Sequence, residues 1–502
     1  MTAPWINQRK TRFPLVFRSV CTTFVPMKRL LTIILAVFGM LTISAESQQE
    51  SNKRVRYKDG PAYIYRISLA DKQGTGFSLE HPTRFLSRRS VDRRRRQGLS
   101  LDSTDLPVSY RYRRLIESRD ICVIGQSRWQ NTLLVRVKDT TLIQRVSKLA
   151  CVTSCRRVWQ APDSVSPTAI KTKYHEHFEE RDSVSGDLYG QTSKQISILK
   201  GQRLHDIGMR GEDMMIGIID GGFKNVDKIP AFQHIDIIGH QDFVTPASPS
   251  IFAETDHGTK VLSTMAVNEP FYYLGTAPKA SYWLLRSEDQ QTEQEVEEDY
   301  WTMAAEFADS VGCDLVNSSL GYNEYDHSSM SYRQWQLDGQ TSFVSRSASM
   351  MAAKGMILVN SAGNSGMGTW KKITVPADAD HILTVGAMLA DEPHKIAPFS
   401  SVGPTQDQRV KPDVVAIGAP TKIVNGRGVI MDDMGTSFAA PVVCGLTACL
   451  WQALRQMTAE ELIALIRQTS SNYEHPDNIY GYGVPNFWRA YQIGSYKPAN
   501  IP

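Results

Sequence analysis

The chain has 502 residues, of which 41% are hydrophobic and 22% are charged. This length exceeds one ordinary domain and predicts two or three folding units, with enough apolar material for a large core. The net charge of +4 is small for the length, which argues against a general polyanion binder and leaves the partners undefined by bulk charge.

The first 45 residues have the pattern of a leader. Lys28 and Arg29 precede an apolar run over 30–43, and the small residues Ser44 and Ala45 follow. This order is typical of a secretory signal peptide. The run has about 14 residues, fewer than the roughly 20 that span a bilayer. An uncleaved anchor or a buried helix is the alternative interpretation.

Residues 1–26 fit poorly ahead of a signal peptide, so Met27 is a candidate for the true start. We therefore expect export to the periplasm or the medium. No second stretch is long and apolar enough to suggest a membrane helix, so we expect no permanent membrane span after signal cleavage.

Residues 46–160 predict a small α+β unit. Residues 62–69 and 132–137 alternate like strands, and 141–149 have helical spacing before a second short extended stretch. The segment between the strands is dense in arginine: Arg84, Arg88, Arg89, Arg93, Arg94, Arg95 and Arg96.

This arginine segment has three interpretations: a nucleic-acid patch, a convertase cleavage site or a solvated helix face. Runs of charge usually face solvent. Phe85 is the only aromatic residue among these arginines, too few to form a platform for stacking on bases. We therefore predict a solvated helix face and no nucleic-acid partner.

Residues 161–195 lose hydrophobic periodicity and are rich in Ser, Pro, Asp and Glu. This composition predicts an exposed linker, the usual place for proteolytic nicking.

Residues 196–495 alternate apolar strands with helices. Strands are expected over 214–219, 281–285, 314–318, 356–360 and 382–386, and helices near 257 and over 292–311, 342–353, 437–454 and 458–468. This alternation predicts an α/β fold with a doubly wound, mostly parallel sheet, preceded by the small α+β unit.

Six of the seven cysteines lie beyond the leader: Cys122, Cys151, Cys155, Cys313, Cys444 and Cys449. An even number after export permits disulfides without establishing them. Cys151 and Cys155 are four residues apart, but no other pair completes a zinc pattern. We expect free buried thiols with at most one disulfide, and no metal site.

Two chemically active residues occupy positions where strands and helices meet. Asp220 ends a predicted strand in IGIIDGGF, and His257 opens a predicted helix in DHGTKV. Alone, the aspartate reads as a turn cap and the histidine as a structural residue. No GxGxxG supports a nucleotide-binding turn.

Ser437 lies in GTSFAAPVVCG, at the start of a helix of small residues. The positive end of a helix stabilises developing negative charge. A serine hydroxyl needs an adjacent base, and a buried carboxylate orients such a histidine. Asn364 follows a predicted strand, and its amide could donate to an oxyanion. Together with Asp220 and His257, these residues predict nucleophilic catalysis.

The order Asp, His, Ser also differs from the chymotrypsin and α/β-hydrolase orders. The stretches IGIIDGGF, DHGTKV, NSSLGY, NSAGNSG, KPDVVAIG and GTSFAAPVVCG resemble, in this order, the motifs of the subtilisin-like (subtilase) family over roughly residues 195–490. The resemblance implies a secreted serine endopeptidase made as a self-processing zymogen.

By the same resemblance, Asp220, His257 and Ser437 match the catalytic triad, and Asn364 matches the oxyanion residue, with the Ser437 N–H as second donor. The substrate-binding positions are Ser319, Leu320, Gly321, Ala362 and Gly363. The first three resemble the strand that pairs with an extended peptide.

Residues 46–160 resemble, more loosely, the family's inhibitory propeptides. The expected partners are peptide or protein substrates and the chain's own propeptide. The chemistry requires no cofactor, and structural calcium has no recognisable ligand loop.

Three positions depart from the family pattern. Gly221 stands where Ser or Thr commonly follows the aspartate, so one hydrogen bond to that carboxylate could be missing. Lys260 replaces a common His, and Phe438 replaces a common Met. All catalytic groups are present, so these changes bear on rate and pH profile only.

Two other functions fit parts of the sequence. A catalytically weak or inactive subtilase fold used for binding predicts that Ser437 does not react with a fluorophosphonate. A polyanion binder acting through the arginine segment predicts strongly salt-dependent binding that is insensitive to Ser437→Ala.

Overall fold

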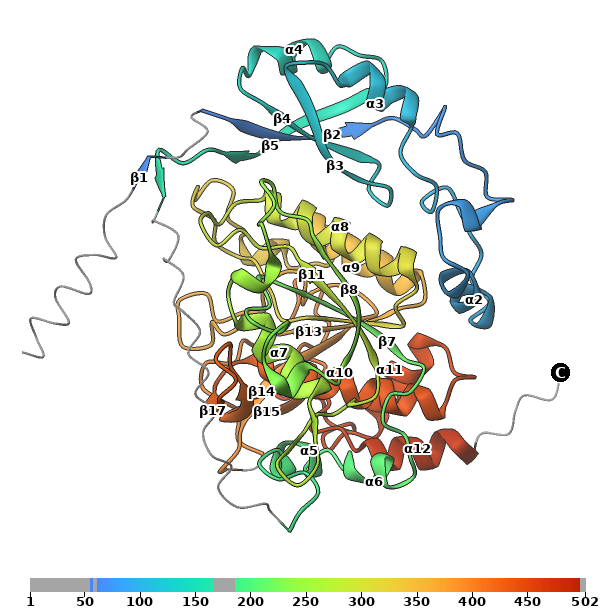
Figure 1. Ribbon diagram of the computed structural model, residues 1–502, viewed down its shortest axis with the longest axis vertical. Coiled ribbons are helices and arrows are strands. Elements are labelled where there is room, and N and C mark those ends of the chain that lie inside the picture. Colours follow the sequence, from blue (N-terminus) through green and yellow to red (C-terminus); the bar gives the residue numbers. More distant parts are fainter. Residues whose placement is uncertain (1–54, 57–60, 166–185, 393, 497–502) are drawn as a thin grey trace, which may run out of the picture. The chain divides into compact units, whose positions relative to one another are not determined.

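The computed structural model describes residues 55–56, 61–165, 186–392 and 394–496. The expected leader and signal peptide, and most of the expected linker, lie outside these residues. Within the described part, the N-terminal unit and the larger C-terminal unit each have their own sheet (Figure 1).

The N-terminal unit contains a four-stranded antiparallel sheet in the order β3-β4-β2-β5. Its strands are β2 (Tyr63–Leu69), β3 (Ile121–Ser127), β4 (Thr132–Val137) and β5 (Val152–Gln160), and its helices are α2 (Arg88–Arg96), α3 (Tyr110–Ile116) and α4 (Thr141–Val146), with the short helix η1 (Pro82–Arg84). Alternate strand residues such as Ile67, Leu133 and Val135 are buried in its own core. Strands β1 (Val55–Arg56) and β6 (Ser164–Val165) form a two-stranded antiparallel sheet.

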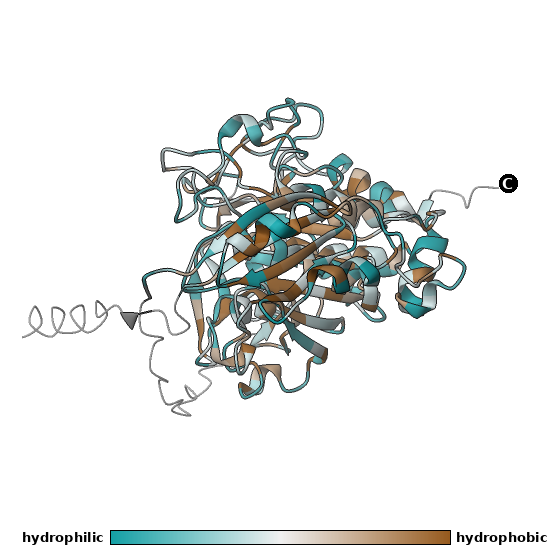
Figure 2. Ribbon diagram, turned by 90° about the horizontal axis from the view of Figure 1, so that it is seen from above, coloured by the Kyte–Doolittle hydropathy of each residue, from teal (hydrophilic) through white to brown (hydrophobic). Residues whose placement is uncertain are grey.

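The C-terminal unit is built on a seven-stranded sheet in which every neighbouring pair is parallel. In order across the sheet, the strands are β15 (Val414–Ala419), β14 (Leu383–Leu389), β13 (Ile357–Ser361), β12 (Leu315–Ser318), β7 (Met215–Asp220), β11 (Ser281–Arg286) and β8 (Asp236–Asp242). Figure 2 shows these strands as largely hydrophobic.

The inner strands are mostly apolar because helices cover both faces of the sheet, whereas the edge strand β8 is largely polar and partly exposed. Successive residues point to opposite faces: Ile218 packs into one core cluster and Ile219 into the other. The helices are α5 (Ser193–Ser197), α6 (Gln202–Asp206), α7 (His257–Ala266), α8 (Val296–Val311), α9 (Phe343–Ala353), α10 (Thr436–Ala453), α11 (Ala459–Gln468) and α12 (Phe487–Tyr496).

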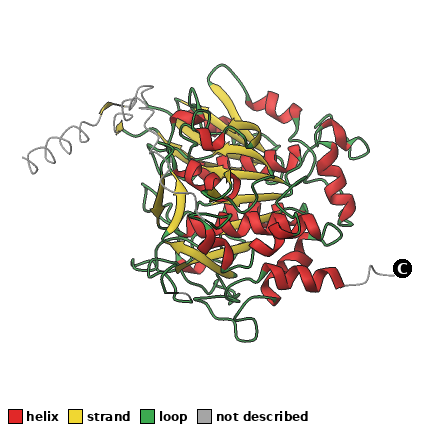
Figure 3. Cartoon of the chain, turned by 60° about the horizontal axis from the view of Figure 1, so that its bottom comes forward, coloured by secondary structure: helices red, strands yellow, loops and turns green. Residues whose placement is uncertain are grey.

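Helices α8 and α9 pack on one face of the sheet, and α7 and α10 pack on the other (Figure 1). Figure 3 shows helices packed around the strands. Short elements complete the fold: β9 (Asn268–Glu269), β10 (Tyr273–Leu274), β16 (Thr421–Val424), β17 (Ile430–Asp433), η2 (Pro230–Phe232), η3 (Ile251–Ala253) and η4 (Gln334–Gln336). The predicted doubly wound α/β fold with a preceding α+β unit is confirmed.

The predicted solvated face of the arginine segment is wrong for its centre. The segment does form a helix, α2, but Arg93 and Arg94 are 0% and 1% exposed. Both guanidinium groups pair with the buried carboxylate of Asp309 on α8, and Arg94 also donates to Asp105 at 2.7 Å. The charges are buried because their partners are buried with them.

Other carboxylates of α8 also contact the N-terminal unit. Asp299 receives two hydrogen bonds from Arg66, at 2.7 and 2.5 Å, and Glu306 receives the backbone N–H groups of Arg128 and Trp129 at 2.9 and 3.0 Å. Helix α8 is therefore the docking face for the N-terminal unit.

The domain edge also differs from the expected one. The boundary between residues 195 and 196 falls inside α5, and Tyr189 is already buried against Ile196 and Leu274. The polar composition of this stretch hid the contact, because its few apolar residues pack on distant segments. Helix α12 and strand β8 are further elements that the periodicity did not predict.

Candidate active site

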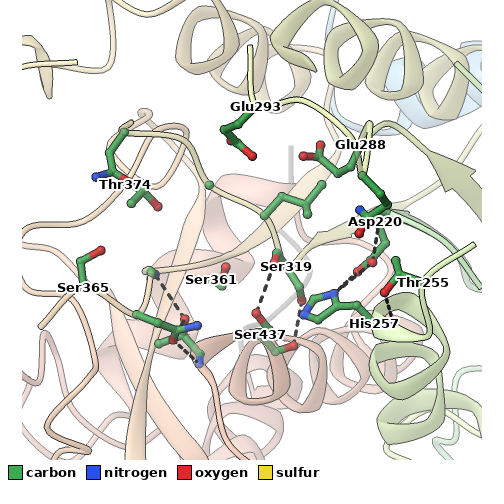
Figure 4. Close-up of a pocket in the computed structure, with 18 residues that line it drawn as sticks. Asp220, Thr255, His257, Glu288, Glu293, Ser319, Ser361, Ser365, Thr374 and Ser437 are labelled. Carbon is green, nitrogen blue, oxygen red and sulfur yellow. Dashed lines mark hydrogen bonds and ion pairs between the residues drawn. The ribbon is translucent and has the colours of Figure 1, made fainter. Parts of the chain in front are cut away.

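A cleft of about 500 Å³ opens at the point of the sheet where the chain switches from adding strands on one side of β7 to adding them on the other. The chain leaves β7 toward β8 and β11 on one side, and continues from β12 through β13, β14 and β15 on the other. Ligands of open α/β sheets bind at the carboxyl ends of strands beside such a switch point. The last residues of β7 and β13, Asp220 and Ser361, both line the cleft (Figure 4).

Asp220 is fully buried at the end of β7. Its carboxylate accepts the Nδ1–H of His257, at 3.0 and 2.9 Å from its two oxygens. It also accepts the backbone N–H of Gly221 at 2.7 Å. The carboxylate thus keeps a hydrogen bond from position 221 although a hydroxyl is absent there.

His257 opens α7, with about a third of its side chain exposed to the cleft. Burial alone would lower the pKa of His257, but the charge and hydrogen bond of Asp220 outweigh it, so the pKa lies above 6.5. Because Nδ1 donates to Asp220, Nε2 is the ring nitrogen left to accept a proton.

Ser437 lies in the first turn of α10, and its residue is 7% exposed. Its hydroxyl donates to the carbonyl of Ser319 at 3.3 Å, and its own carbonyl accepts the Ser319 hydroxyl at 2.8 Å. The ring of the next residue, Phe438, lies 5.9 Å from the imidazole of His257. Figure 4 shows Ser437 beside His257, although the serine hydroxyl is turned to Ser319.

Asn364 presents its amide nitrogen to the cleft. Its Oδ1 accepts both the N–H and the hydroxyl of Thr436, each at 2.9 Å. A backbone N–H can only donate, so the oxygen must face Thr436 and Nδ2 must face away from it. The preceding Gly363 has a φ of +106°, a conformation that favours glycine and turns the chain back toward α10.

Four of the five expected substrate-binding residues line the cleft: Ser319, Leu320, Gly321 and Gly363. The exception is Ala362, which does not line it. Its side chain is fully buried, its N–H donates to Val385, and its carbonyl accepts from Thr374. The side chain of Ala362 thus packs in the core, and the expected role of this residue in substrate binding stays a prediction.

The cleft contains further polar residues that the motifs did not indicate. Glu288 follows β11 and Thr374 follows β13, and both line the cleft. Burial raises the pKa of Glu288 to about 8, while hydroxyls of Tyr322 and Ser287 donate to its carboxylate at 2.6 and 3.0 Å. Only the fold brings these residues to the cleft, so no motif or spacing could have indicated them.

No group of three or more His, Cys, Asp or Glu side chains suited to a metal ion occurs in the described part of the chain. The six cysteines described there are free. Of the helices described, α10 alone is long and apolar enough to cross a membrane, and 89% of it is buried in the protein core.

Comparisons with known proteins agree with this arrangement. Residues 211–483 match the Subtilase family, and residues 64–176 match the peptidase S8 propeptide domain of Bacteroidota. The chain is 27% identical over 304 residues to "Subtilisin DY" of Bacillus licheniformis, covering 59% of this chain and 97% of the relative. It is 24% identical over 312 residues to "Serine protease AprX" of Bacillus subtilis, covering 55% and 66%.

Proposed function

Because the chain belongs to the subtilase family and is therefore a serine endopeptidase, we propose that Asp220, His257 and Ser437 are its catalytic triad. The observation that carries this proposal is the hydrogen-bonded pair of Asp220 and His257 in one cleft with Ser437 at a helix N-terminus.

In the proposed mechanism, Nε2 of His257 accepts the proton of the Ser437 hydroxyl as Oγ attacks the peptide carbonyl. This requires the hydroxyl to rotate from Ser319 toward His257; hydrogen bonds between catalytic groups often tighten only when substrate binds. The imidazolium then protonates the leaving amine, and water hydrolyses the acyl-enzyme by the same route in reverse.

The negative charge on the tetrahedral oxygen is stabilised by two donors. Asn364 Nδ2 is directed away from Thr436, and the Ser437 N–H belongs to the first turn of α10, where helix N–H groups have no partner within the helix. This chemistry uses protein groups alone. Structural calcium is not part of the proposal.

The substrate is proposed to bind as an extended peptide along residues 319–321, adding a strand at the end of β12. The propeptide match over 64–176, with α8 as its docking face, supports a zymogen that cleaves itself within residues 160–195. Export through a signal peptide ending near Ala45 completes the proposal.

The test is to express the wild-type chain and Ser437→Ala in a protease-deficient host. The wild type should give a mature fragment that begins within 160–195 and reacts with a fluorophosphonate at Ser437. Ser437→Ala should accumulate as signal-cleaved precursor. Ser349→Ala, at a half-buried serine of α9 that does not line the cleft, should mature normally. Normal maturation of Ser437→Ala would rule out self-cleavage.

A binding protein with a weak or inactive site is the second candidate, because the Ser437 hydroxyl is bonded to Ser319 and not to His257. A folded wild-type chain that fails to react with the fluorophosphonate would establish this alternative.

A further inference from the structure

Lys260 lies three residues after His257 on α7, at a position where the family pattern commonly has His. Its side chain is 21% exposed, and its ammonium group contacts two carboxylates. Nζ lies 3.0 Å from Oδ2 of Asp433 and 3.6 Å from Oδ1 of Asp256. One cation thus joins two acidic residues that are far apart in the chain.

Asp256 connects this cation to the segment that carries His257, the next residue. Its carbonyl accepts the N–H of Lys260 at 3.0 Å, and its Oδ2 accepts the N–H of Gly426 at 3.1 Å. Gly426 lies in the turn between β16 and β17, and its carbonyl accepts Nδ2 of Asn225 at 2.8 Å. The turn of this hairpin is therefore bonded to the start of α7.

Asp433 connects the same cation to the segment that leads to Ser437. It ends β17 and stands four residues before the serine. Its Oδ1 accepts the N–H of Met434 at 2.8 Å, while Oδ2 faces the ammonium group. The N–H groups of the next two residues are also bonded, to Gly418 and Asn364, each at 2.9 Å. The backbone from 434 to 436 is therefore held at every residue.

The ammonium group thus links the segments of the two side chains that must react together. Figure 4 shows His257 and Ser437 side by side in the cleft. A general base must come within about 2.6–3.2 Å of the group whose proton it takes. A misplacement of about 1 Å, even one caused far from the reacting atoms, can lower the rate about a hundredfold. The relative position of these two segments is therefore part of the chemistry.

We propose that Lys260 is a positioning residue that holds the segment of His257 and the segment of Ser437 at the spacing that proton transfer requires. This inference rests on the proposed function. The ammonium group acts through Asp256 and Asp433, because Lys260 itself does not line the cleft.

The same ammonium group also influences the protonation of His257. The charged or titratable groups around the imidazole come from β7, α7, β17 and the residues after β11: Asp220, Asp256, Lys260, Asp433 and Glu288. Burial lowers the pKa of His257 and Asp220 outweighs it, while Lys260 lowers this pKa and Asp256 raises it. Loss of the ammonium charge should therefore raise the pKa of His257, and loss of the Asp433 charge should lower it.

The experiment compares Lys260→Met and Asp433→Asn with the wild type, as mature enzymes acting on a peptide anilide. Fluorophosphonate titration of Ser437 gives the concentration of active enzyme in each sample. Both variants break the same ion pair, so kcat should fall about tenfold or more in both, with little change in KM. The pH at which kcat/KM is half-maximal on the acid side should shift by about 0.3–0.5 pH units, upward for Lys260→Met and downward for Asp433→Asn.

Two further variants distinguish positioning from a merely structural ion pair. Lys260→Arg keeps the charge and should retain most of kcat. Lys422→Met is the matched control, because Lys422 forms an ion pair with Asp432 at 2.9 Å on the same hairpin. It should leave both kcat and the half-maximal pH unchanged, whatever its effect on thermal melting.

A folded Lys260→Met enzyme with near wild-type kcat and an unchanged half-maximal pH would overturn the proposal. An equal loss of kcat in Lys422→Met would do the same, because any ion pair of the hairpin would then have this effect. If Lys260→Met does not fold, Asp433→Asn decides alone, and an unchanged or upward-shifted half-maximal pH in that variant contradicts the proposal.

Fluorophosphonate labelling also separates this result from the proposed function. A wild type that is labelled and active, with an equally active Lys260→Met, refutes only the role of Lys260. A folded wild type that is neither labelled nor active refutes the proposed function itself.

Discussion

Charged or polar groups are buried both on helix α8 and in the cleft, but the two regions differ in the partners that these groups have. On α8, Asp309 contacts Arg93, Arg94 and Arg128, so each buried charge has a counter-charge. In the cleft, Glu288 has only hydroxyl donors and acidic neighbours, and the Thr374 hydroxyl has no partner.

The direction of the pKa shifts reflects this contrast. Burial alone would raise the pKa of Asp309, but three guanidinium groups outweigh it and hold the pKa below its usual range. Burial raises the pKa of Glu288 to about 8, because the hydrogen bonds from Tyr322 and Ser287 do not outweigh it and the charges of Glu293 and Asp220 add to it. Buried charges on α8 thus pair with opposite charges of the N-terminal unit, whereas in the cleft Glu288 accepts only from hydroxyls and the Thr374 hydroxyl has no partner.

The largest expected effect is on the free energy of unfolding, when the ion pairs on α8 are broken. Asp309→Ala leaves three arginines without their shared carboxylate, and breaking a buried ion pair costs about 3–5 kcal/mol. Denaturant unfolding of the uncleaved Ser437→Ala precursor, with and without Asp309→Ala, measures this loss. The exposed pair of Arg95 and Asp92 provides the control, because Asp92→Ala should cost less than about 1 kcal/mol. Equal losses of stability in Asp309→Ala and Asp92→Ala would show that the buried ion pairs on α8 contribute no more than an exposed one.

The next effect concerns a donor held ready in the cleft. Asn364→Ala should lower kcat by about 10²–10³-fold with little change in KM, the range known for the equivalent donor in subtilisin. Asn364→Asp should be at least as damaging, because it places an acceptor and a negative charge beside the oxyanion. Steady-state kinetics on a peptide anilide, with thermal melting as the folding control, measures both. A folded Asn364→Ala enzyme with near wild-type kcat would exclude this amide from the mechanism.

The smallest expected effect is one of pH. The pKa of Glu288 rises from 4.5 to about 8 on folding, so the folded state binds this proton more tightly. Its contribution to stability is complete below about pH 4.5 and is lost as the pH rises through about 8. Glu288→Gln should therefore reduce the loss of stability over this range by at least about 1 kcal/mol, the equivalent of one pKa unit. Parallel pH–stability curves for the two proteins would contradict the raised pKa.

The proposed catalytic residues could be predicted from the sequence, because the reaction requires particular residue types. Asp220, His257, Ser437 and Asn364 stand at strand ends or helix starts within recognisable motifs, and the fold brings all four to one cleft. The parallel sheet was also predictable, because its strands are buried on both faces and read as continuous apolar runs.

Residues whose role depends on distant neighbours could not be predicted. Arg93 looked solvated because Asp309, its partner, is 216 residues away in the chain. Thr374 looked ordinary because only the fold places two glycines beside its hydroxyl. The inward side chain of Ala362 depends on the register of its strand end, which the motif did not specify.

The contacts on α8 also have an electrophoretic consequence. Residues 61–163 contain 20 Lys and Arg against 9 Asp and Glu, a net charge of +11, whereas residues 186–502 contain 23 against 36, a net charge of −13. The nearly neutral precursor is thus the sum of a cation and an anion. Removal of the N-terminal unit should turn a nearly neutral zymogen into a strongly acidic enzyme that migrates toward the anode. Rising ionic strength should weaken the long-range electrostatic attraction between the two cleaved parts. The buried arginine–aspartate ion pairs should be screened much less and should keep the parts bound.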